Sequence, residues 1–554
     1  MNGRPTRRGA AIPFIMIVAF LLVPGTSGQT TGVAPFEIDR ATLSRIKGEA
    51  QDHSRAWDYA FFLTDVFGPR MSGSTNYLAA ARWAIETLQG IGLANVHEEP
   101  LGELEIAPGL KWSGRGWSFS RLSIRMVEPQ AVPLNGVPAG WSRGTNGKIS
   151  GEVVLAPLPK GPAEAESYLS KYKGKLKNKI VLISDRAPIR DQDTRAFSRY
   201  DDEGLAKLAL PPERPSEPQL RPGVPASSAP PKPETTMSQI LDAWNRVLDF
   251  LHDEGVLALV QAAGGQGGLL FTTNQIGPPD PRNDPPPTVS IAAEQYNRLL
   301  RLRDKGLPIR LEIELETQFT RDADHFNIIA DLPGGAKKDE VVMMGAHLDS
   351  WFGGTGATDD AAGVAVIMEA ARILRKLGLA LPRTVRLALW DAEELNSRGS
   401  SAFVEASLRD GRTGAAKPLR DRLSVYFNMD NGAGKIRGVY LQGNKEAIPT
   451  FEAWLRPLKD LGASTVSIRD SEGSDHLMLD RAGIPAFAFI QDPLNYSRTH
   501  HSTLDLLDYV PPGDLMQAAT VIAALVFEAA NNPYLVPRKP SSAAAPPRTP
   551  ASVD

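Results

Sequence analysis

The sequence predicts an α/β protein, in which a mostly parallel mixed sheet flanked by helices is interrupted by a β-rich insertion. From Asp324 onward, apolar runs typical of buried strands alternate with helical patterns, as in parallel sheets covered on both faces. Between residues 117 and 315, short β-like runs are separated by glycine and proline turns. In the C-terminal half, acidic and histidine side chains follow directly after the predicted strands.

The amino-acid composition limits which partners and which metal ligands are possible. The 554 residues include 61 Lys and Arg against 64 Asp and Glu, a formal net charge of −3, which argues against a nucleic-acid partner. The chain has no cysteine, so disulfides, cysteine zinc sites and thiol nucleophiles are excluded. Any metal ion must therefore be held by His, Asp and Glu.

The N-terminus is typical of an export signal. Three arginines precede an apolar stretch, residues 10–23, which is too short to span a bilayer comfortably. Small residues near position 28 offer a cleavage site. We therefore expect a secreted or periplasmic protein with no stable membrane span after cleavage, the alternative being an uncleaved anchor.

Helices and short strands are predicted in the first part of the chain. Apolar residues at helical spacing from Leu43 to Leu63, and the alanine-rich stretch Tyr77–Ile91, predict helices. The proline-rich segment Pro211–Glu234 predicts a disordered or extended surface loop. The expected strands of the insertion are Leu122–Val127, Gly151–Ala156, Ile180–Ser184, Val256–Gln261 and Ile309–Leu315.

Four strands and one helix are expected to build the functional region. Ligands of open α/β sheets bind beyond the carboxyl ends of parallel strands. The expected elements are the strands Glu340–Ala346, Thr384–Trp390, Leu423–Met429 and Ile484–Ile490 and the helix Val364–Leu377. The side chains that follow the strands or open the helix are His347, Asp349, Asp359, Glu393, Glu394, Asp430, His500 and His501.

This set of side chains is sufficient for a two-metal site. Two imidazoles and three carboxylates can hold two divalent ions if one carboxylate bridges them, and such ligands suit Zn²⁺, with Mn²⁺ or Co²⁺ left open. Water between two such ions becomes a nucleophile near neutral pH, and a further carboxylate must take its proton. The pair Glu393 and Glu394 can supply one base and one ligand, and Asp349 can accept the second ring N–H of His347.

The sequence blocks AHLDSW, GATDDAAG, DAEE, NMDN and THHSTLD resemble those of the M28 family of co-catalytic zinc exopeptidases, in particular its carboxypeptidase Q-like branch. The resemblance covers roughly residues 36–125 and 320–535, and it implies the zinc exopeptidase fold with an inserted protease-associated (PA) domain. The implied organisation is an export signal (1–28), the first part of the peptidase domain (29–127), a PA-like insertion (128–318) with a disordered proline-rich loop (205–237), the second part of the peptidase domain with the metal site (319–536), and a disordered tail (537–554).

Carried over residue by residue, the resemblance assigns roles to individual side chains. It implies that His347 and Asp430 bind one zinc, that Glu394 and His501 bind the other, and that Asp359 bridges the two. It implies that Glu393 is the general base and that the Asp359–Asp360 peptide bond is cis. Asp349, as the support of the His347 ring, is expected to be a further catalytic residue. The candidate substrate-binding residues are Asp475, His476, Tyr496, Arg498 and His500.

The expected activity is hydrolysis of terminal peptide bonds in peptides, by a metal-bound hydroxide with Glu393 as the base. Whether the enzyme is an aminopeptidase, a carboxypeptidase or a dipeptidase is left open. The alternatives are a single-zinc acyltransferase resembling glutaminyl cyclases and a non-catalytic receptor-like homologue. The insertion could serve as a substrate lid or as the surface of a homodimer, and the sequence does not separate these roles.

Overall fold

The main sheet has eight strands, and it contains each of the four strands that were expected beside the functional residues. The computed structural model describes residues 35–102, 105–107, 110–111, 115–189, 197–212, 237–272, 285–320, 325–471 and 473–540. The strand order is β1 (Ala94–Pro100), β12 (Phe326–Leu332), β14 (Arg383–Trp390), β13 (Lys337–His347), β15 (Leu423–Asn428), β18 (Ala486–Gln491), β16 (Ile436–Tyr440) and β17 (Thr465–Ser467).

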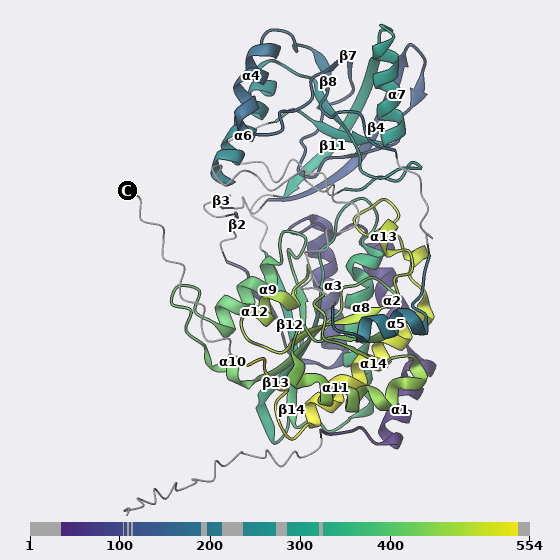
Figure 1. Cartoon of the computed structure of the whole chain (residues 1–554), viewed down its shortest axis with the longest axis vertical. Helices are drawn as coiled ribbons and strands as arrows, with labels where there is room; N and C mark the ends of the chain where they lie inside the picture. The colour runs from purple at the N-terminus through teal and green to yellow at the C-terminus, as the bar shows by residue number, and fades with distance from the viewer. Residues whose placement is uncertain are drawn as a thin grey trace, which may run out of the picture. The chain divides into compact units, whose positions relative to one another are not determined.

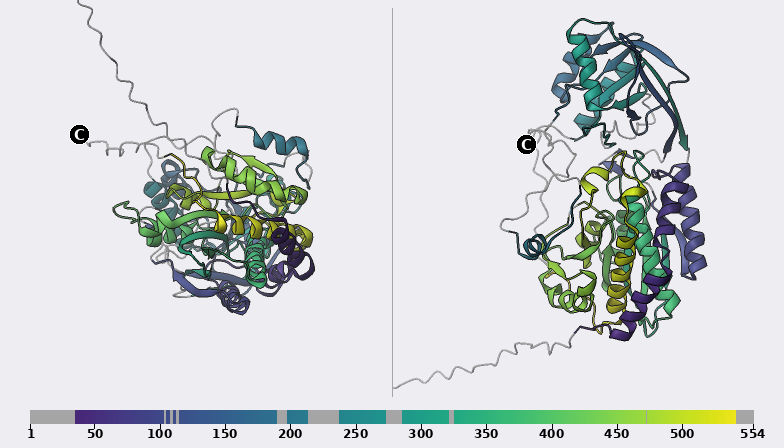
Figure 2. Two further views of the ribbon diagram at one scale, coloured as in Figure 1. Left: turned by 90° about the horizontal axis from the view of Figure 1, so that it is seen from below. Right: turned by 90° about the vertical axis from the view of Figure 1, so that its right-hand side faces the viewer.

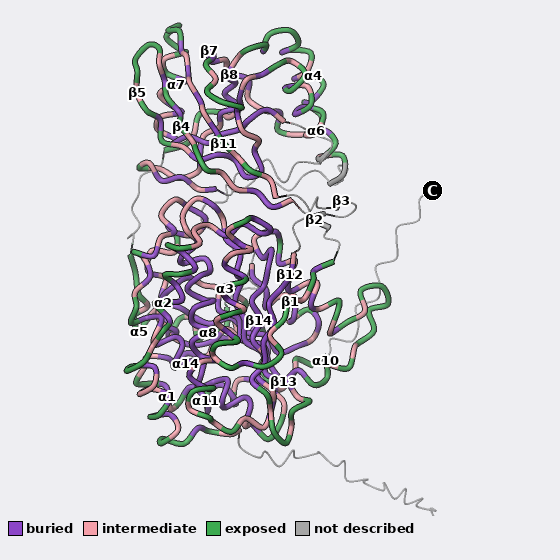
Figure 3. The backbone as a smooth tube through the Cα atoms, turned by 180° about the vertical axis from the view of Figure 1, so that it is seen from behind, coloured by how far each residue is buried: buried purple, intermediate pink, exposed green. Residues whose placement is uncertain are grey.

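The centre of this sheet is parallel. Strand β13 pairs in parallel with β14 and β15, and β15 pairs in parallel with β18. Strand β12 pairs antiparallel with β1 and β14, and β16 pairs antiparallel with β18 and in parallel with β17, so the sheet is mixed. Every residue of β12, β15 and β18 is buried, as expected for strands covered on both faces (Figure 3). The carboxyl ends of β13, β14, β15 and β18 therefore lie along one edge of the sheet.

Helices cover the sheet on both sides. The buried helices α8 (Ala362–Leu377) and α14 (Pro512–Asn531) lie side by side, with α1 (Arg40–His53) and α2 (Ala56–Phe61) packed against them (Figure 2). The helix α3 (Thr75–Ile91) begins at Ser74, whose hydroxyl accepts a hydrogen bond from the Tyr77 amide, and ends at Gly92 with φ +89°. The helical pattern from Leu43 to Leu63 is divided at Ser54 and Arg55, which separate α1 from α2.

Helix α14 is long and apolar enough to cross a membrane by length and composition. However, 89% of its apolar window is buried inside the protein, where the helix packs against α8. No other described helix passes the same test. In the described part of the chain, α14 therefore has the burial of a core helix.

The second sheet is built by the insertion. Its order is β5 (Val132–Pro133), β4 (Gly116–Glu128), β11 (Arg310–Thr320), β7 (Ile149–Leu155), β8 (Lys179–Leu182), β9 (Ala258–Ala262), β10 (Thr288–Ile291) and β6 (Gly136–Pro138). The helices α4 (Pro162–Tyr172), α6 (Met237–Asp253) and α7 (Ala293–Asp304) belong to the same part of the chain (Figure 1). The five expected strands are present, but β4 begins at Gly116, earlier than the boundary expected at 128. Its PA-like identity stays a prediction.

The remaining described strands and α-helices are short. They are the strands β2 (Glu105–Ala107) and β3 (Leu110–Lys111) and the helices α5 (Asp202–Ala209), α9 (Arg398–Phe403), α10 (Pro418–Arg422), α11 (Ile448–Leu455), α12 (His476–Arg481) and α13 (Tyr496–Thr499). Helix α5 corrects the expected disordered loop 205–237 at its start, because the Asp201 carboxylate caps the helix and Leu205 is buried. Residues 213–236, the signal 1–28 and the tail from 541 lie outside the described residues. The two sheets belong to one compact unit, Pro35–Asp554.

Candidate active site

The five expected metal ligands meet at the carboxyl edge of the main sheet. His347 ends β13, Glu394 follows β14 and Asp430 follows β15. His501 lies in residues 492–505 after β18, which we call the histidine loop. Asp359 lies in the turn that leads into α8, and all five side chains are at least nine-tenths buried.

Asp359 stands between two imidazoles and presents one carboxylate oxygen to each. Its Oδ1 lies 3.1 Å from His347 Nε2, and its Oδ2 lies 2.9 Å from His501 Nε2. Each imidazole has a second carboxylate beside the same nitrogen. Asp430 Oδ1 is 3.7 Å from His347 Nε2, and Glu394 Oε2 is 2.9 Å from His501 Nε2. The arrangement is two His–carboxylate pairs that share one aspartate.

Asp349 connects the loops after β13 and β14. Its two carboxylate oxygens accept the backbone N–H groups of Glu393 and Glu394, at 3.1 and 3.3 Å. His347 Nδ1 lies 2.9 Å from the backbone carbonyl of Asp349 and 3.5 Å from its carboxylate. Asp349 therefore lies beside the His347 ring, and the shorter contact is to its carbonyl, because its carboxylate accepts the N–H groups of the glutamate loop.

The peptide bond between Asp359 and Asp360 is cis, as the resemblance implied. The Asp360 carboxylate accepts the backbone N–H of His347 at 3.2 Å and that of Gly363 at 3.1 Å. A Cβ atom at Gly363 would lie 2.2 Å from Asp360 Oδ1 and 2.4 Å from the Met429 carbonyl. Only glycine permits this close approach, which ties the start of α8 to the ends of β13 and β15.

Buried carboxylates outnumber the imidazoles in this cluster. Burial alone would lower the pKa of both imidazoles, but the surrounding carboxylates outweigh burial; they raise the pKa of His347 well above its ordinary value and that of His501 to about 10. Burial raises the pKa of Glu393 well above its ordinary value, and the charges of Asp430 and Asp475 act in the same direction. The site therefore favours positive charge among its carboxylates.

The donor set fits divalent metal ions. Among the described residues, neither Asp359 Oδ2 nor Glu394 Oε1 has an aligned hydrogen-bond partner, although both atoms are buried. Buried carboxylate oxygens without hydrogen bonds are costly unless a cation compensates them. The ligand atoms of His347, Asp359 and Glu394 all lie within 4.8 Å of one another, and the same is true of Asp359, His500 and His501. Imidazole and carboxylate ligands in this number are typical of zinc.

The candidate substrate residues fall into two groups. Asp475 is buried and accepts a hydrogen bond from the Ser400 hydroxyl, and its neighbours include the charges of His347 and Asp430. Its pKa is raised to about 7 by burial. In contrast, the ring Nε2 of His476 lies 3.1 Å from Gln442 Nε2 and from the Ser471 carbonyl, and burial lowers the pKa of His476 to about 4. His476 is thus placed as a neutral, structural imidazole.

The other three candidates lie in the histidine loop. The ring of His500 stacks on His501 with centroids 3.7 Å apart, and its Nε2 lies 3.6 Å from Asp359 Oδ2. Tyr496 makes an edge contact with His500, and Arg498 is exposed. His501, not His500, makes the shorter contact with Asp359, as expected from the sequence.

Several supporting residues were not expected. The fully buried Arg70 donates hydrogen bonds to backbone carbonyls on both sides of the glycine-rich loop after β13. The Asp391 carboxylate accepts the Ser72 hydroxyl at 2.6 Å and lies 3.2 Å from His325 Nδ1. The Asp505 carboxylate accepts the N–H and the hydroxyl of Thr358, next to the bridging aspartate. Their partners are distant in sequence, and no local motif marks them.

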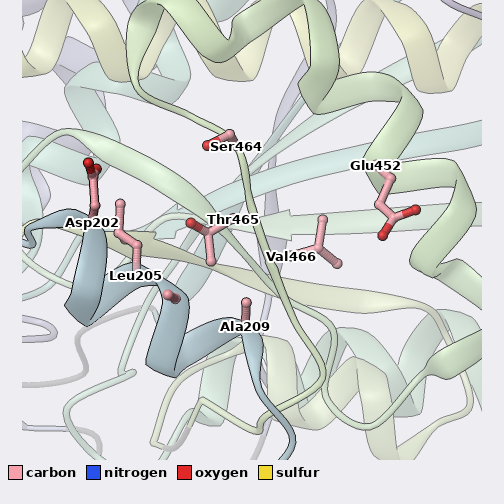
Figure 4. A pocket seen from close by; sticks show the side chains of 8 residues that line it. Asp202, Leu205, Ala209, Glu452, Ser464, Thr465 and Val466 are labelled. Atoms are coloured by element: carbon pink, nitrogen blue, oxygen red, sulfur yellow. The ribbon is translucent and has the colours of Figure 1, made fainter.

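A cavity of about 350 Å³ lies elsewhere, between helix α5 and strand β17 (Figure 4). Asp202 and Leu205 line it on the helix, and Thr465 and Val466 line it on the strand. None of the expected site residues lines this cavity, so it does not belong to the candidate active site.

Known proteins are similar to this chain in sequence and in fold. Residues 327–526 match the sequence model of Peptidase family M28. Carboxypeptidase Q of Mus musculus is 25% identical over 488 residues, which cover 88% of this chain and 87% of the relative. Leupeptin-inactivating enzyme 1 of Streptomyces exfoliatus is 32% identical over 173 residues, which cover 31% of this chain and 37% of the relative.

Two solved structures have the same fold. A peptidase M28 precursor from Shewanella amazonensis has a TM-score of 0.61 at 23% identity, covering 90% of this chain and 98% of its own. BSAP, a zinc aminopeptidase from Bacillus subtilis, has a TM-score of 0.51 at 19% identity, covering 87% and 94%. The expected fold class and family resemblance are therefore confirmed: residues 327–526 match Peptidase family M28, and the chain is a metallopeptidase.

Proposed function

We propose that this chain is an exported exopeptidase with a co-catalytic pair of zinc ions, which removes residues from the ends of peptides. The observation that supports this proposal best is the shared aspartate. Asp359 faces a different imidazole with each of its oxygens, and each imidazole has its own second carboxylate. A single-metal site would have no use for the second pair.

In this proposal His347 and Asp430 would hold one ion, Glu394 and His501 would hold the other, and Asp359 would serve both. Zinc ions bound there would polarise the scissile carbonyl and lower the pKa of bound water. The lone buried oxygens of Asp359 and Glu394 support this assignment, since each lacks an aligned hydrogen bond among the described residues. Mn²⁺ and Co²⁺ have similar ligand preferences and are the alternatives to test.

Glu393 is the proposed proton carrier. Its backbone N–H is fixed by the Asp349 carboxylate, and its side chain is more than nine-tenths buried beside Glu394. It takes the proton from the attacking water and returns it to the leaving amine. Asp349 is a positioning residue in this scheme, because it holds the backbone of both glutamates and the ring of His347.

The Glu393→Gln variant tests the role of the base. Glutamine keeps the size of the side chain and leaves the backbone bond to Asp349 intact, so zinc content should stay at two ions per chain. Turnover should fall by about 10²–10⁴-fold, the range typical for the loss of a general base. A Glu393→Gln chain with wild-type turnover would refute the assignment. One zinc per wild-type chain would instead favour the acyltransferase alternative.

The end of the peptide that is attacked needs its own experiment, because the relatives include a carboxypeptidase and an aminopeptidase by name. One peptide with free ends, and two versions with one end blocked, are digested and their product ladders are read by mass spectrometry, with a chelator control. Trimming that stops with a blocked N-terminus indicates an aminopeptidase, and trimming that stops with a blocked C-terminus indicates a carboxypeptidase. No cleavage, with two zinc ions bound, would refute exopeptidase activity.

Export is proposed from the N-terminal signal pattern in residues 1–28. Expression of the full chain in a bacterial host, followed by fractionation and N-terminal sequencing, tests it. A mature chain that begins near Gln29 in the periplasm or medium is expected. An uncleaved chain that stays with the membrane would contradict this part of the proposal.

A further inference from the structure

The inserted domain contacts the loop that carries His501, and it does so at both ends of that loop. The contacts come from two separate segments of the insertion, residues 197–200 and 270–272. We call them the first and the second clamp. They lie far apart in sequence, yet both reach the histidine loop, residues 492–505.

The second clamp holds the carboxyl-terminal half of the loop by main-chain hydrogen bonds. The His501 carbonyl accepts the Thr272 N–H at 2.8 Å and its hydroxyl at 3.0 Å. The Thr503 N–H donates to the Leu270 carbonyl at 3.0 Å, and Phe271 pairs with Ser502 in an antiparallel bridge. The metal-site histidine is thus held by a short two-stranded pairing, and Thr272 is buried.

The second clamp is itself fixed to the sheet of the insertion. It follows β9, and the Ala263 N–H donates to the carbonyl of Ile291 at the end of β10. The Phe271 N–H donates a hydrogen bond to the Gly264 carbonyl, and the Asn135 side chain donates one to the Gly268 carbonyl. These contacts make the clamp a hairpin of the inserted domain that ends against His501.

The first clamp holds the amino-terminal end of the loop by charge. Arg199 lies 2.9 Å from a carboxylate oxygen of Asp492, whose side chain is fully buried, and 2.7 Å from one of Asp514. The Tyr200 N–H donates to the other Asp492 oxygen at 3.0 Å. Ser198 and Leu494 exchange two backbone hydrogen bonds, at 3.1 and 2.8 Å.

An aromatic contact adds a third connection. The ring of Trp141, from the insertion, makes an edge contact with Trp351 at 6.1 Å between centroids. Trp351 makes a similar contact with the His501 ring at 6.0 Å. The imidazole is therefore bordered by a side chain that the insertion also supports.

His501 needs such support. Its backbone φ is +54°, a conformation that residues with a side chain adopt when their surroundings fix it. Its Nε2 also lies 2.9 Å from a carboxylate oxygen of Asp359 and 2.9 Å from one of Glu394. His347, in contrast, ends a central strand and is held by Asp349 and Asp360 of the peptidase part.

We propose that the inserted domain is a positioning element of the metal centre: by holding the histidine loop at Asp492 and at His501, it sets the affinity of the site formed by His501 and Glu394, and not that of the site formed by His347 and Asp430. The inference rests on the proposed two-metal function. It assigns the insertion a role that neither a lid nor a dimer surface requires.

The test combines one change in each clamp. Arg199→Met removes one of the two arginines paired with Asp492, leaving Arg437, and it removes the ion pair with Asp514. Thr272→Val removes the hydroxyl donor while keeping the shape of the side chain. Thr272→Ser restores the hydroxyl, and Arg186→Met is the matched control, since it removes an exposed arginine–carboxylate pair with Asp304 inside the insertion. Zinc alone is titrated into each chelator-stripped full-length chain by calorimetry.

We expect the Arg199→Met/Thr272→Val chain to bind one zinc about tenfold more weakly, the usual loss when a supporting partner of a ligand is removed. In an Asp430→Asn background, where the His501 site remains, the same loss should appear. In a Glu394→Gln background it should not. Two control chains, Thr272→Ser with native Arg199 and Arg186→Met, should bind zinc as the wild type does.

Equal affinities in the wild-type and doubly changed chains would overturn the inference, and so would equal weakening of both sites. A wild-type chain that binds a single zinc would refute the co-catalytic centre itself, so the two failures are distinguishable. Hydrogen exchange of the metal-free chains gives a second readout. Amides of residues 501–503 should exchange faster in the doubly changed chain, whereas those of β13 should not, and unchanged exchange at 501–503 would also overturn the inference.

Discussion

Replacing Arg70 by methionine should destabilise both the fold and the metal site. The Arg70 guanidinium is fully buried and makes four short hydrogen bonds to main-chain carbonyls. They are 2.8 Å to Leu63, 2.8 Å to Leu348, 2.8 Å to Thr355 and 3.0 Å to Gly356. Methionine fills much of the space but donates no hydrogen bond, so four buried carbonyls lose their charged partner.

The magnitude follows from these bonds. Each unsatisfied buried polar group costs about 1–3 kcal/mol, which gives roughly 4–12 kcal/mol for four carbonyls. Single substitutions seldom exceed about 4–5 kcal/mol, because the surroundings relax. We therefore expect a loss of about 4 kcal/mol. At about 2–4 °C per kcal/mol for a domain of this size, the melting temperature should fall by roughly 10 °C.

Differential scanning calorimetry at a fixed scan rate measures this change, with zinc content determined on the same samples. Arg70→Lys should be intermediate, since one ammonium group cannot reach carbonyls on three segments. Arg45→Met is the matched control, because Arg45 is exposed and donates one bond, to the Leu377 carbonyl. An Arg70→Met chain that melts within 2 °C of the control would refute the reasoning.

Three further predictions follow from other buried contacts. Burial raises the pKa of Glu528 well above its ordinary 4.5, so the folded chain keeps a proton that the unfolded chain releases, and stability falls as pH rises from that value. Glu528→Gln, which keeps an acceptor for the Ile38 N–H, should therefore raise the melting temperature more at pH 8 than at pH 5, and equal gains would contradict this sign. Gly363→Ala should lower the melting temperature and the zinc affinity, because its Cβ would lie 2.2 Å from Asp360 Oδ1. The control Gly48→Ala, which meets open space, should not lower either in scanning calorimetry and zinc titration. Zinc added to the stripped chain should raise the apparent stability by about 2.7 kcal/mol at 100 times its dissociation constant, and a melting temperature that does not change with zinc would exclude a native-state site.

The strands and the site residues at their ends could be predicted because their signals are local. Strand β13 contains a buried apolar run, Val341–Ala346, that leads to His347, and β15 and β18 are mostly apolar and buried throughout. A buried parallel strand needs no distant partner to be seen in a sequence, and its end marks where ligands gather.

Strand β4 starts six residues before the expected strand Leu122–Val127, for a physical reason. In β4 the apolar residues Trp117 and Phe119 occupy odd-numbered positions, whereas Leu122, Ile124 and Met126 occupy even-numbered positions. The pairing with β11 is irregular between Phe119 and Arg121, so one extra residue changes which positions face the core. The alternation that predicts a strand is broken there, and only its second half was recognisable.

The supports of the site could not be predicted, because their partners are far away and often main-chain atoms. Arg70 reaches Gly356, and Thr272 reaches His501, across more than 200 residues in each case. Carbonyl acceptors have no side-chain signature, so a lone arginine in a loop is indistinguishable from a solvent-exposed one. The fold must be known before such a residue can be assigned.

The proposed ligands and their supports are therefore distributed differently along the chain. Every proposed ligand lies between His347 and His501, inside the region that matches the family model. Asp349 and Asp505 hold ligand loops from within this region, but other supports lie before it: Arg70 precedes the insertion, and the two clamps are parts of the insertion. A chain trimmed to residues 327–526 would keep all five ligands but lose the contacts of Arg70 with Gly356, of Arg199 with Asp492 and of Thr272 with His501. The cooperative unit that builds this site is thus larger than the sequence region that identifies it.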